Sequence, residues 1–276
     1  MAAAARRNFD DIITVLLFDD SSDNSSSDED DLDLLLVESL FPPQTNKDVL
    51  DDIYDRFKHL LESLDLIWLD PQLFSQVIYD KGAPLEQCWG FIDGTPRPIA
   101  RPTANQRIMY SGHKRTHCLK FQSVQAPNGL IAHMYGPIEG RRHDAFMLGE
   151  SGLLNKLQRF QKPSGEPYVI YGDPAYGITQ NIISPFRGAR LPPDQQQFNS
   201  LMSKVRVTVE WGFGKITQLF AFLDFKRNLK VLLQPTAKYY LVACVLVNCH
   251  TCLYGSQTSK FFGLDPPTLE RYLSNQ

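Results

Sequence analysis

Three carboxylates in this chain stand where acids from separate elements can meet. Asp93 follows the apolar run 88–92, and Asp173 follows a second apolar run that ends near Tyr171. Glu210 lies within a segment of helical periodicity. Carboxylates brought together in this way can hold two divalent cations about 3.5–4 Å apart, which activate an attacking oxygen and stabilise a leaving one. The residue types therefore indicate metal-dependent phosphoryl transfer on nucleic acid.

Simpler interpretations compete for each acid taken alone. An isolated Asp after a strand is commonly a turn or capping residue. Asp173, however, is flanked by Gly172, Pro174 and Gly177, which predicts a tight turn that exposes its carboxylate. A glycosidase, which uses two acids and no metal, is the alternative chemistry. Binding of Mn²⁺ would distinguish the two kinds of site.

Strand-forming and helix-forming segments alternate in an order typical of a mixed α/β fold. Five strands are expected, at 88–92, at 116–125, at 130–135, before Asp173 and at 181–186. A helix should follow Asp144 as its N-cap, and a long helix should begin at about Phe198. The long helix buries a stripe of apolar residues, with Glu210 at its border: Met202, Val205, Val209, Phe213, Ile216 and Phe220. The first and fourth strands can lie side by side, which would bring Asp93 and Asp173 together.

The net charge of −3 conceals an acidic front and a basic body. Residues 1–90 contain 6 Lys and Arg against 20 Asp and Glu, whereas residues 91–276 contain 22 against 11. A basic body suits a polyanionic partner such as DNA. A well-solvated surface is the alternative interpretation. The candidate DNA contacts are Arg97, Arg101, Lys114, Arg115, Arg141 and Arg142.

The chain divides into four parts by composition. Residues 1–46 are rich in Ser and Asp and predict a disordered acidic arm. Residues 47–81 form a short helical segment, in which 48–66 has the spacing of an amphipathic helix. The catalytic domain is expected over 82–255, and residues 256–276 are a C-terminal extension.

Cysteine usage and hydropathy exclude some classes of protein. Five cysteines are an odd number, so no disulfide framework is indicated and a reducing compartment is expected. Cys249, His250 and Cys252 lie in an apolar helical stretch without a second ligand pair, which favours a core over a zinc site. The apolar runs 12–18 and 239–247 are too short for a signal peptide and a membrane span, respectively.

Five ordered motifs carry a resemblance to a known family. They are Trp89-Gly90-Phe91-Ile92-Asp93-Gly94-Thr95, Tyr110-Ser111-Gly112-His113-Lys114-Arg115, Gly140-Arg141-Arg142-His143-Asp144, Tyr171-Gly172-Asp173-Pro174-Ala175-Tyr176-Gly177 and Arg206-Val207-Thr208-Val209-Glu210-Trp211-Gly212-Phe213-Gly214. Together they resemble the DDE domain of PIF/Harbinger transposases and their domesticated nuclease relatives. The resemblance spans about residues 82–255.

This resemblance implies an RNase H-like fold, a mixed five-stranded sheet flanked by helices. The acids that match Asp93, Asp173 and Glu210 bind divalent metal, Mg²⁺ or Mn²⁺, for DNA strand cleavage and transfer. Asp144 matches a further acid, for which a metal-binding role and a capping role both stay open.

The resemblance also implies DNA as a partner, with a separate Myb-like protein that supplies DNA binding and nuclear entry. The expected location is the nucleus, and a second copy of the chain is a further candidate partner. Such transposases carry a larger helical DNA-binding region before the catalytic domain. Here the segment before Asp93 is about 90 residues long and acidic in composition. A domesticated DNA- or protein-binding factor without catalysis is therefore the alternative function.

Overall fold

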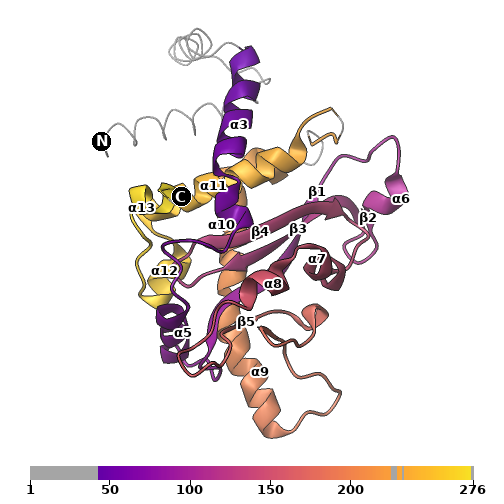
Figure 1. Cartoon of the computed structure of the whole chain (residues 1–276). Coiled ribbons are helices and arrows are strands. Elements are labelled where there is room, and N and C mark those ends of the chain that lie inside the picture. The colour runs from indigo at the N-terminus through magenta and orange to yellow at the C-terminus, as the bar shows by residue number, and fades with distance from the viewer. Residues whose placement is uncertain (1–42, 225–228, 232, 275–276) are drawn as a thin grey trace, which may run out of the picture.

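The computed structural model describes residues 43–224, 229–231 and 233–274, and it shows a mixed sheet flanked by helices (Figure 1). The six strands of the sheet are β1 (Cys88–Pro98), β2 (Tyr110–Ser111), β3 (Thr116–Gln125), β4 (Ile131–Glu139), β5 (Val169–Tyr171) and β6 (Ile182–Ile183). The α-helices between β1 and the end of the sheet are α6 (Gln106–Met109), α7 (Asp144–Glu150) and α8 (Leu153–Leu157), and the 3₁₀-helix η1 (Pro174–Tyr176) follows β5.

Two groups of helices precede and follow the sheet. Those before it are α3 (Pro43–Phe57), α4 (His59–Glu62) and α5 (Pro71–Asp80). Those after it are α9 (Pro193–Arg206), α10 (Thr208–Leu219), the 3₁₀-helix η2 (Ala221–Asp224), α11 (Thr236–Tyr254), α12 (Gln257–Phe262) and α13 (Leu269–Leu273). None of the helices in the described ranges is long and apolar enough to cross a bilayer.

The sheet confirms the predicted adjacency of the first and fourth expected strands. Its order is β2-β3-β1-β5-β6, and β4 also pairs with β3. β3 pairs antiparallel with β1, β2 and β4, whereas β5 pairs parallel with β1 and with β6. The short strand β2 makes six strands rather than the predicted five, because two residues are too few to show an alternating pattern.

β1 is longer than predicted. It was expected to end before Asp93, but it continues to Pro98 because β3 pairs with it from Phe91 as far as Pro98. On its other side the pairing with β5 ends at Phe91↔Tyr171. Asp93 therefore lies inside β1, two residues beyond the point where that side of the strand loses its neighbour.

The two faces of β1 contact different helices, because successive side chains point to opposite faces of a sheet. Phe91 stacks on Phe262 of α12 at 6.3 Å between ring centroids, and Arg97 lies 5.0 Å from the ring centroid of Tyr240 in α11. Asp93 shares this face. Gly94 points the other way, where a Cβ atom would lie 3.0 Å from Oδ1 of Asp144 in α7.

The long helix expected from about Phe198 begins earlier, at Pro193, and it consists of α9 and α10. Val207 joins them in a right-handed helical conformation, so the two helices are almost continuous. The stripe predicted to be buried is buried at every position: Met202, Val205, Val209, Phe213, Ile216 and Phe220.

The other predicted helices differ at their ends. Asp144 is the first residue of α7 rather than its N-cap, which is His143, and Gly152 in a left-handed conformation separates α7 from α8. The amphipathic segment 48–66 forms α3 and α4 but stops at Glu62, where the Ser63 hydroxyl accepts a hydrogen bond from the Asp65 amide and competes with further helix. α3 begins at Pro43, so 43–46 of the predicted arm are helical, and the rest of that arm lies outside the described residues.

Candidate functional site

An acid cluster, defined here as Asp93, Asp144 and Asp173, lies beyond the point where β5 ends. Asp93 is provided by β1, Asp173 is the N-cap of η1, and Asp144 begins α7. Burial raises the pKa of Asp93 to about 6, although Arg206 and the backbone amide of Gly94 lower it. The negative charges of Asp173 and Asp144 add to the increase, so both carboxylates lie near enough to act on Asp93.

The turn after β5 fixes Asp173 as the sequence predicted. Its Oδ1 accepts a hydrogen bond of 2.8 Å from the Ala175 amide, and Pro174 occupies the first helical position of η1. A Cβ atom at Gly172 would come within 2.7 Å of Ile92 Cγ2, so only glycine lets β5 approach β1 so closely here. The turn holds its acid against the strand that carries Asp93.

Tyr176 lies in the middle of the acid cluster. Burial raises its pKa well above the usual value, and Asp144, Asp93 and Asp173 each raise it further. Within the described part of the chain, its hydroxyl is buried and has no hydrogen-bond partner. An unpartnered hydroxyl among three carboxylates indicates a polar site that is not completed by the protein alone.

Asp93 has a basic partner that the sequence analysis did not assign. Arg206, the last residue of α9, places Nη2 3.0 Å from Oδ1 of Asp93, and about a fifth of each side chain is exposed. The spacing of Arg206 and Glu210 is the signal that could have found it. Residues four apart lie on the same side of a helix, with Cβ atoms about 5–6 Å apart.

The structure does not bring Glu210 into contact with the acid cluster. Its side chain is exposed in the first turn of α10. Among the described residues, no group of three or more His, Cys, Asp and Glu side chains is arranged to hold one metal ion. Glu210 follows Arg206 by four residues, across the junction of α9 and α10 at Val207.

Asp144 occupies a different position from the other two acids. It lies over Gly94, on the face of β1 opposite to Asp93, and Lys120 Nζ is 3.6 Å from its Oδ1. The same Nζ donates a hydrogen bond of 2.6 Å to the carbonyl oxygen of Arg142. Asp144 thus has an ion-pair partner in Lys120, although its carboxylate still raises the pKa of Asp93.

The donor chemistry of the site fits a hard divalent cation. Mg²⁺ and Mn²⁺ prefer carboxylate oxygens, and Asp93 and Asp173 supply them next to each other. Their mutual repulsion is what a bound cation would relieve. Arg206 supplies one positive charge to Asp93, so the cluster keeps more acidic groups than basic partners.

The candidate DNA contacts fall into two groups. Lys114, Arg115 and Arg141 are exposed. The other three already have partners in the structure: Arg97 donates to Thr95 and lies over Tyr240, Arg101 donates to Gln106, and Arg142 pairs with Glu139.

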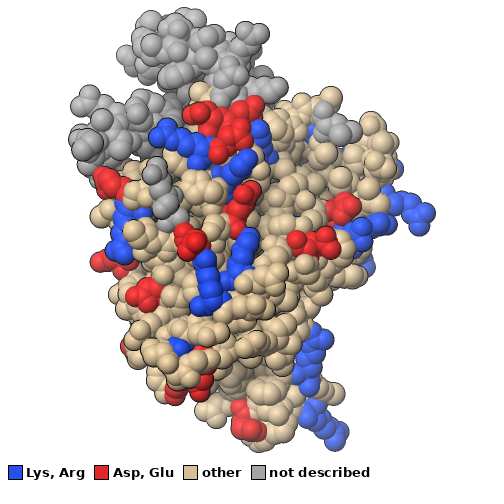
Figure 2. Space-filling model, viewed as in Figure 1, with Lys and Arg blue, Asp and Glu red and all other residues tan. Residues whose placement is uncertain are grey.

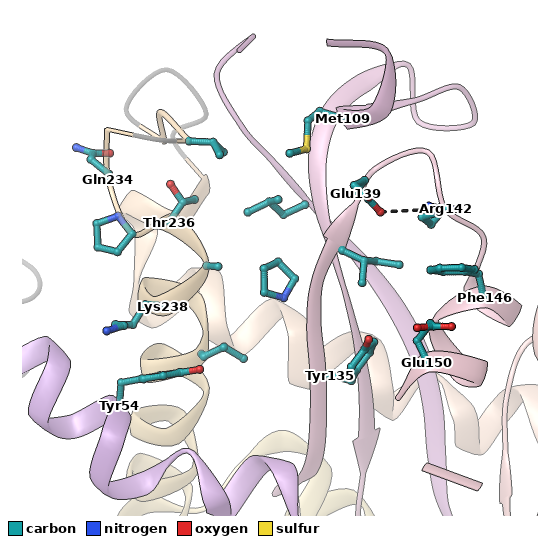
Figure 3. A pocket seen from close by; sticks show the side chains of 17 residues that line it. Tyr54, Met109, Tyr135, Glu139, Arg142, Phe146, Glu150, Gln234, Thr236 and Lys238 are labelled. Atoms are coloured by element: carbon teal, nitrogen blue, oxygen red, sulfur yellow. Dashed lines mark hydrogen bonds and ion pairs between the residues drawn. The ribbon is translucent and has the colours of Figure 1, made fainter. Parts of the chain in front are cut away.

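A cavity of about 760 Å³ lies away from the acid cluster, between β4, α7, α11 and α3 (Figure 3). We call it the β4 groove. Glu139 and Glu150 line it together with Arg142, Phe146 and Lys238. Figure 3 shows Glu139 turned toward Arg142, and their ion pair measures 3.2 Å. The groove therefore contains acids, but neither Asp93 nor Asp173.

Comparison with known proteins shows the family of this chain. The model of the DDE superfamily endonuclease family matches residues 92–248, more than half of the chain, and the chain belongs to this family. Endonucleases of this superfamily typically use divalent metals. The match contains Asp93, Asp144, Asp173, Arg206 and Glu210.

One relative of the chain is described as a transposase. The chain is 27% identical over 122 residues to a protein of Microchaete diplosiphon described as a probable transposase for insertion sequence element IS702. The match covers 43% of this chain and 42% of the relative, so the chain spans less than half of that protein's length. No solved structure matches the chain.

Proposed function

We propose that this protein is a metal-dependent DNA endonuclease of the transposase type, in which Asp93, Asp173 and Glu210 bind divalent metal. The observation that carries the proposal is the parallel pairing of β5 with β1, together with the pKa of Asp93, which is raised chiefly by burial and further by Asp173. In this proposal Glu210 completes the set from α10, which follows directly on the helix whose last residue, Arg206, pairs with Asp93. Asp144 is a fourth candidate ligand.

A finer classification forms part of the proposal. We assign the domain over 82–255 to the RNase H-like folds and to the PIF/Harbinger group. An antiparallel arrangement of β1, β3 and β4 continued by parallel β5 and β6 supports the first assignment. The five ordered motifs of the sequence support the second.

Cleavage would proceed by in-line attack on a phosphodiester by water, or by a 3′-hydroxyl during strand transfer. Bound Mg²⁺ or Mn²⁺ supplies activation of the attacking oxygen and stabilisation of the leaving oxygen. Asp93 and Asp173 hold their carboxylates at the end of β5, and the Ala175 amide fixes the orientation of Asp173. Arg206 orients Asp93, and exposed Lys114, Arg115 and Arg141 are available for phosphate contacts.

DNA is the proposed partner, with a Myb-like protein that supplies sequence recognition and entry into the nucleus. Self-association of the chain is a further proposal. The acidic front, with 20 Asp and Glu among residues 1–90, suits a basic protein partner better than it suits DNA.

A nicking assay tests the function. Supercoiled plasmid is incubated with the full chain and Mg²⁺ or Mn²⁺, and the open circular product is measured. We expect nicking with metal, none with EDTA, and none by Asp173→Asn with metal. Nicking that is equally fast with EDTA, or equally fast in the variant, would contradict the proposal.

The second candidate is a domesticated DNA- or protein-binding factor without catalysis. Two observations favour it: Arg206 already neutralises Asp93, and Glu210 is exposed without contact to the acid cluster. It predicts no metal-dependent nicking by the wild type, together with DNA or protein binding that does not respond to Asp173→Asn.

A further inference from the structure

An exposed aromatic side chain lies beside the turn that carries Asp173. Phe186, in the segment between β6 and α9, is 42% exposed. Arg187 and Arg190 follow it, and both are exposed. Within the described part of the chain, neither arginine side chain forms a hydrogen bond or an ion pair. Figure 2 shows Lys and Arg side chains standing out from the lower right edge of the molecule, where Figure 1 places the segment that leads into α9.

The backbone of Phe186 is held at two points. The Asn199 side chain of α9 accepts a hydrogen bond of 2.9 Å from the Phe186 amide and donates one of 3.0 Å to its carbonyl oxygen. Phe198 meets the Phe186 ring edge-on at 5.3 Å between centroids, and Phe198 in turn packs edge-on against Tyr171 at 6.4 Å. A series of rings thus connects the exposed aromatic to the end of β5.

One hydroxyl links this segment to the acid cluster. Ser184 Oγ lies 3.1 Å from the carbonyl oxygen of Asp173 and 2.5 Å from that of Gly177. Phe186 comes only two residues after Ser184. On the same turn, Ile178 is 68% exposed. Two large apolar side chains, Phe186 and Ile178, therefore face solvent on segments that are held to the turn of Asp173 by this hydroxyl.

We propose that Phe186 is a stacking platform for an unpaired DNA base next to the cleaved phosphodiester, and that Arg187 and Arg190 contact the phosphates of that strand. This inference rests on the proposed nuclease function. Within duplex DNA both faces of a base are covered by its neighbours, so an exposed ring stacks on an unpaired base without first unstacking the duplex. Aromatic rings combined with basic side chains are how proteins bind single strands.

Charge favours this ligand over a protein partner. Two guanidinium groups that lack acidic partners are suited to bind a polyanion. A single strand of DNA offers both bases for the ring and phosphates for the arginines. Two hydrogen bonds with Asn199 hold the backbone of Phe186 in place before DNA binds, so little conformational entropy is lost on binding.

Binding without metal tests this inference separately from cleavage. Affinities of the full chain are measured in EDTA for a blunt duplex and for the same duplex with a short single-stranded overhang. We expect the wild type to prefer the overhang by roughly tenfold, in the range that one base–aromatic stack supplies. Phe186→Ala should lose the preference and Phe186→Trp should keep it. Tyr79→Ala, which removes an aromatic of similar exposure (43%) from α5, is the matched control and should also keep it.

The arginines have their own readout. Replacing Arg187 and Arg190 together by Ala should lower the dependence of log K on log salt by about 1.4 for the overhang, as loss of two single-strand phosphate contacts predicts. No preference for the overhang in the wild type, or an equal preference in Phe186→Ala, would overturn the inference. If the plasmid assay shows no metal-dependent nicking but the preference depends on Phe186, the nuclease proposal fails and the platform stands.

Discussion

The acid cluster and the β4 groove both combine carboxylates with arginine or lysine, but they differ in the direction in which the pKa of a carboxylate is shifted. In the groove, Glu139 pairs with Arg142, and its pKa is lowered by a hydrogen bond to its own backbone amide and by that arginine. Lys238 pairs with Asp51 on α3. In the acid cluster, burial raises the pKa of Asp93 to about 6 in spite of Arg206, and two further aspartates contribute.

This difference indicates where chemistry belongs. The groove has the volume that a small ligand needs, about 760 Å³, but its Glu139 is paired with Arg142 and has a lowered pKa. In the acid cluster, burial and two nearby aspartates disfavour the charged form of Asp93, as happens at sites that bind cations. A buried carboxylate with a raised pKa and two further acids near it is therefore a better marker of function here than cavity size.

The largest expected effect is on DNA cleavage. Asp173→Asn should reduce metal-dependent nicking by more than about a hundredfold, because even partners outside the ligand shell of a metal contribute 10–100-fold. Glu150→Gln, in the β4 groove, removes a carboxylate of the same charge and should leave the rate unchanged. Comparable losses in the two variants would remove the distinction between the regions.

Removal of an arginine from each region tests the next difference. Arg206→Ala leaves the partly buried Asp93 without its partner, and we expect a loss of about 1–3 kcal/mol in the free energy of unfolding without metal. Arg142→Ala breaks a pair in which each side chain is 35% exposed and should cost about 0–1 kcal/mol.

Manganese makes this second test specific. Urea denaturation with and without millimolar Mn²⁺ should show that the ion stabilises Arg206→Ala more than it stabilises the wild type, because Asp93 is then released for the cation. An equal gain in both proteins would show that Arg206 does not compete with metal.

Two glycines in α10 test how tightly the helix of Glu210 is held to the sheet. A Cβ atom at Gly212 would come within 1.9 Å of Oε1 of buried Gln125 on β3, whose Nε2 donates to the carbonyl oxygen of Val209. Gly212→Ala should therefore destabilise the fold by about 1–3 kcal/mol. Thermal denaturation of the purified variant measures the loss.

Gly214, two residues further on, is the matched control and carries the smallest expected effect. A Cβ atom there has nothing within 4 Å, so Gly214→Ala should stabilise α10 by up to about 1 kcal/mol. If Gly212→Ala is as stable as Gly214→Ala, α10 does not lie as close to β3 as the structure shows. The position of Glu210, which α10 carries, would then be in error as well.

Much of the fold could be predicted from the sequence because its signals are local. The apolar stripe from Met202 to Phe220 specifies one face of a helix, and all of its six members are buried. The Asn128-Gly129 turn marks the hairpin of β3 and β4. The order of elements was sufficient to place β5 beside β1.

The rest depends on contacts between distant segments. β1 continues past Asp93 only because β3 pairs with it as far as Pro98, and β2 exists only as a two-residue partner of β3. The ion pair of Asp93 and Arg206 joins a strand to a helix more than a hundred residues later. The same reasoning placed Arg97 among the DNA contacts, although its register on β1 turns it toward Tyr240.

The central claim is that Asp93 and Asp173 of the acid cluster bind divalent metal. Titration with Mn²⁺, followed by the loss of the free-ion signal in electron paramagnetic resonance, measures it directly. We compare the wild type, the double variant Asp93→Asn with Asp173→Asn, and the double variant Glu139→Gln with Glu150→Gln. The account predicts that the wild type and the groove variant bind Mn²⁺ alike and that the acid-cluster variant loses this binding. Equal binding by all three proteins, or a loss confined to the groove variant, would contradict it.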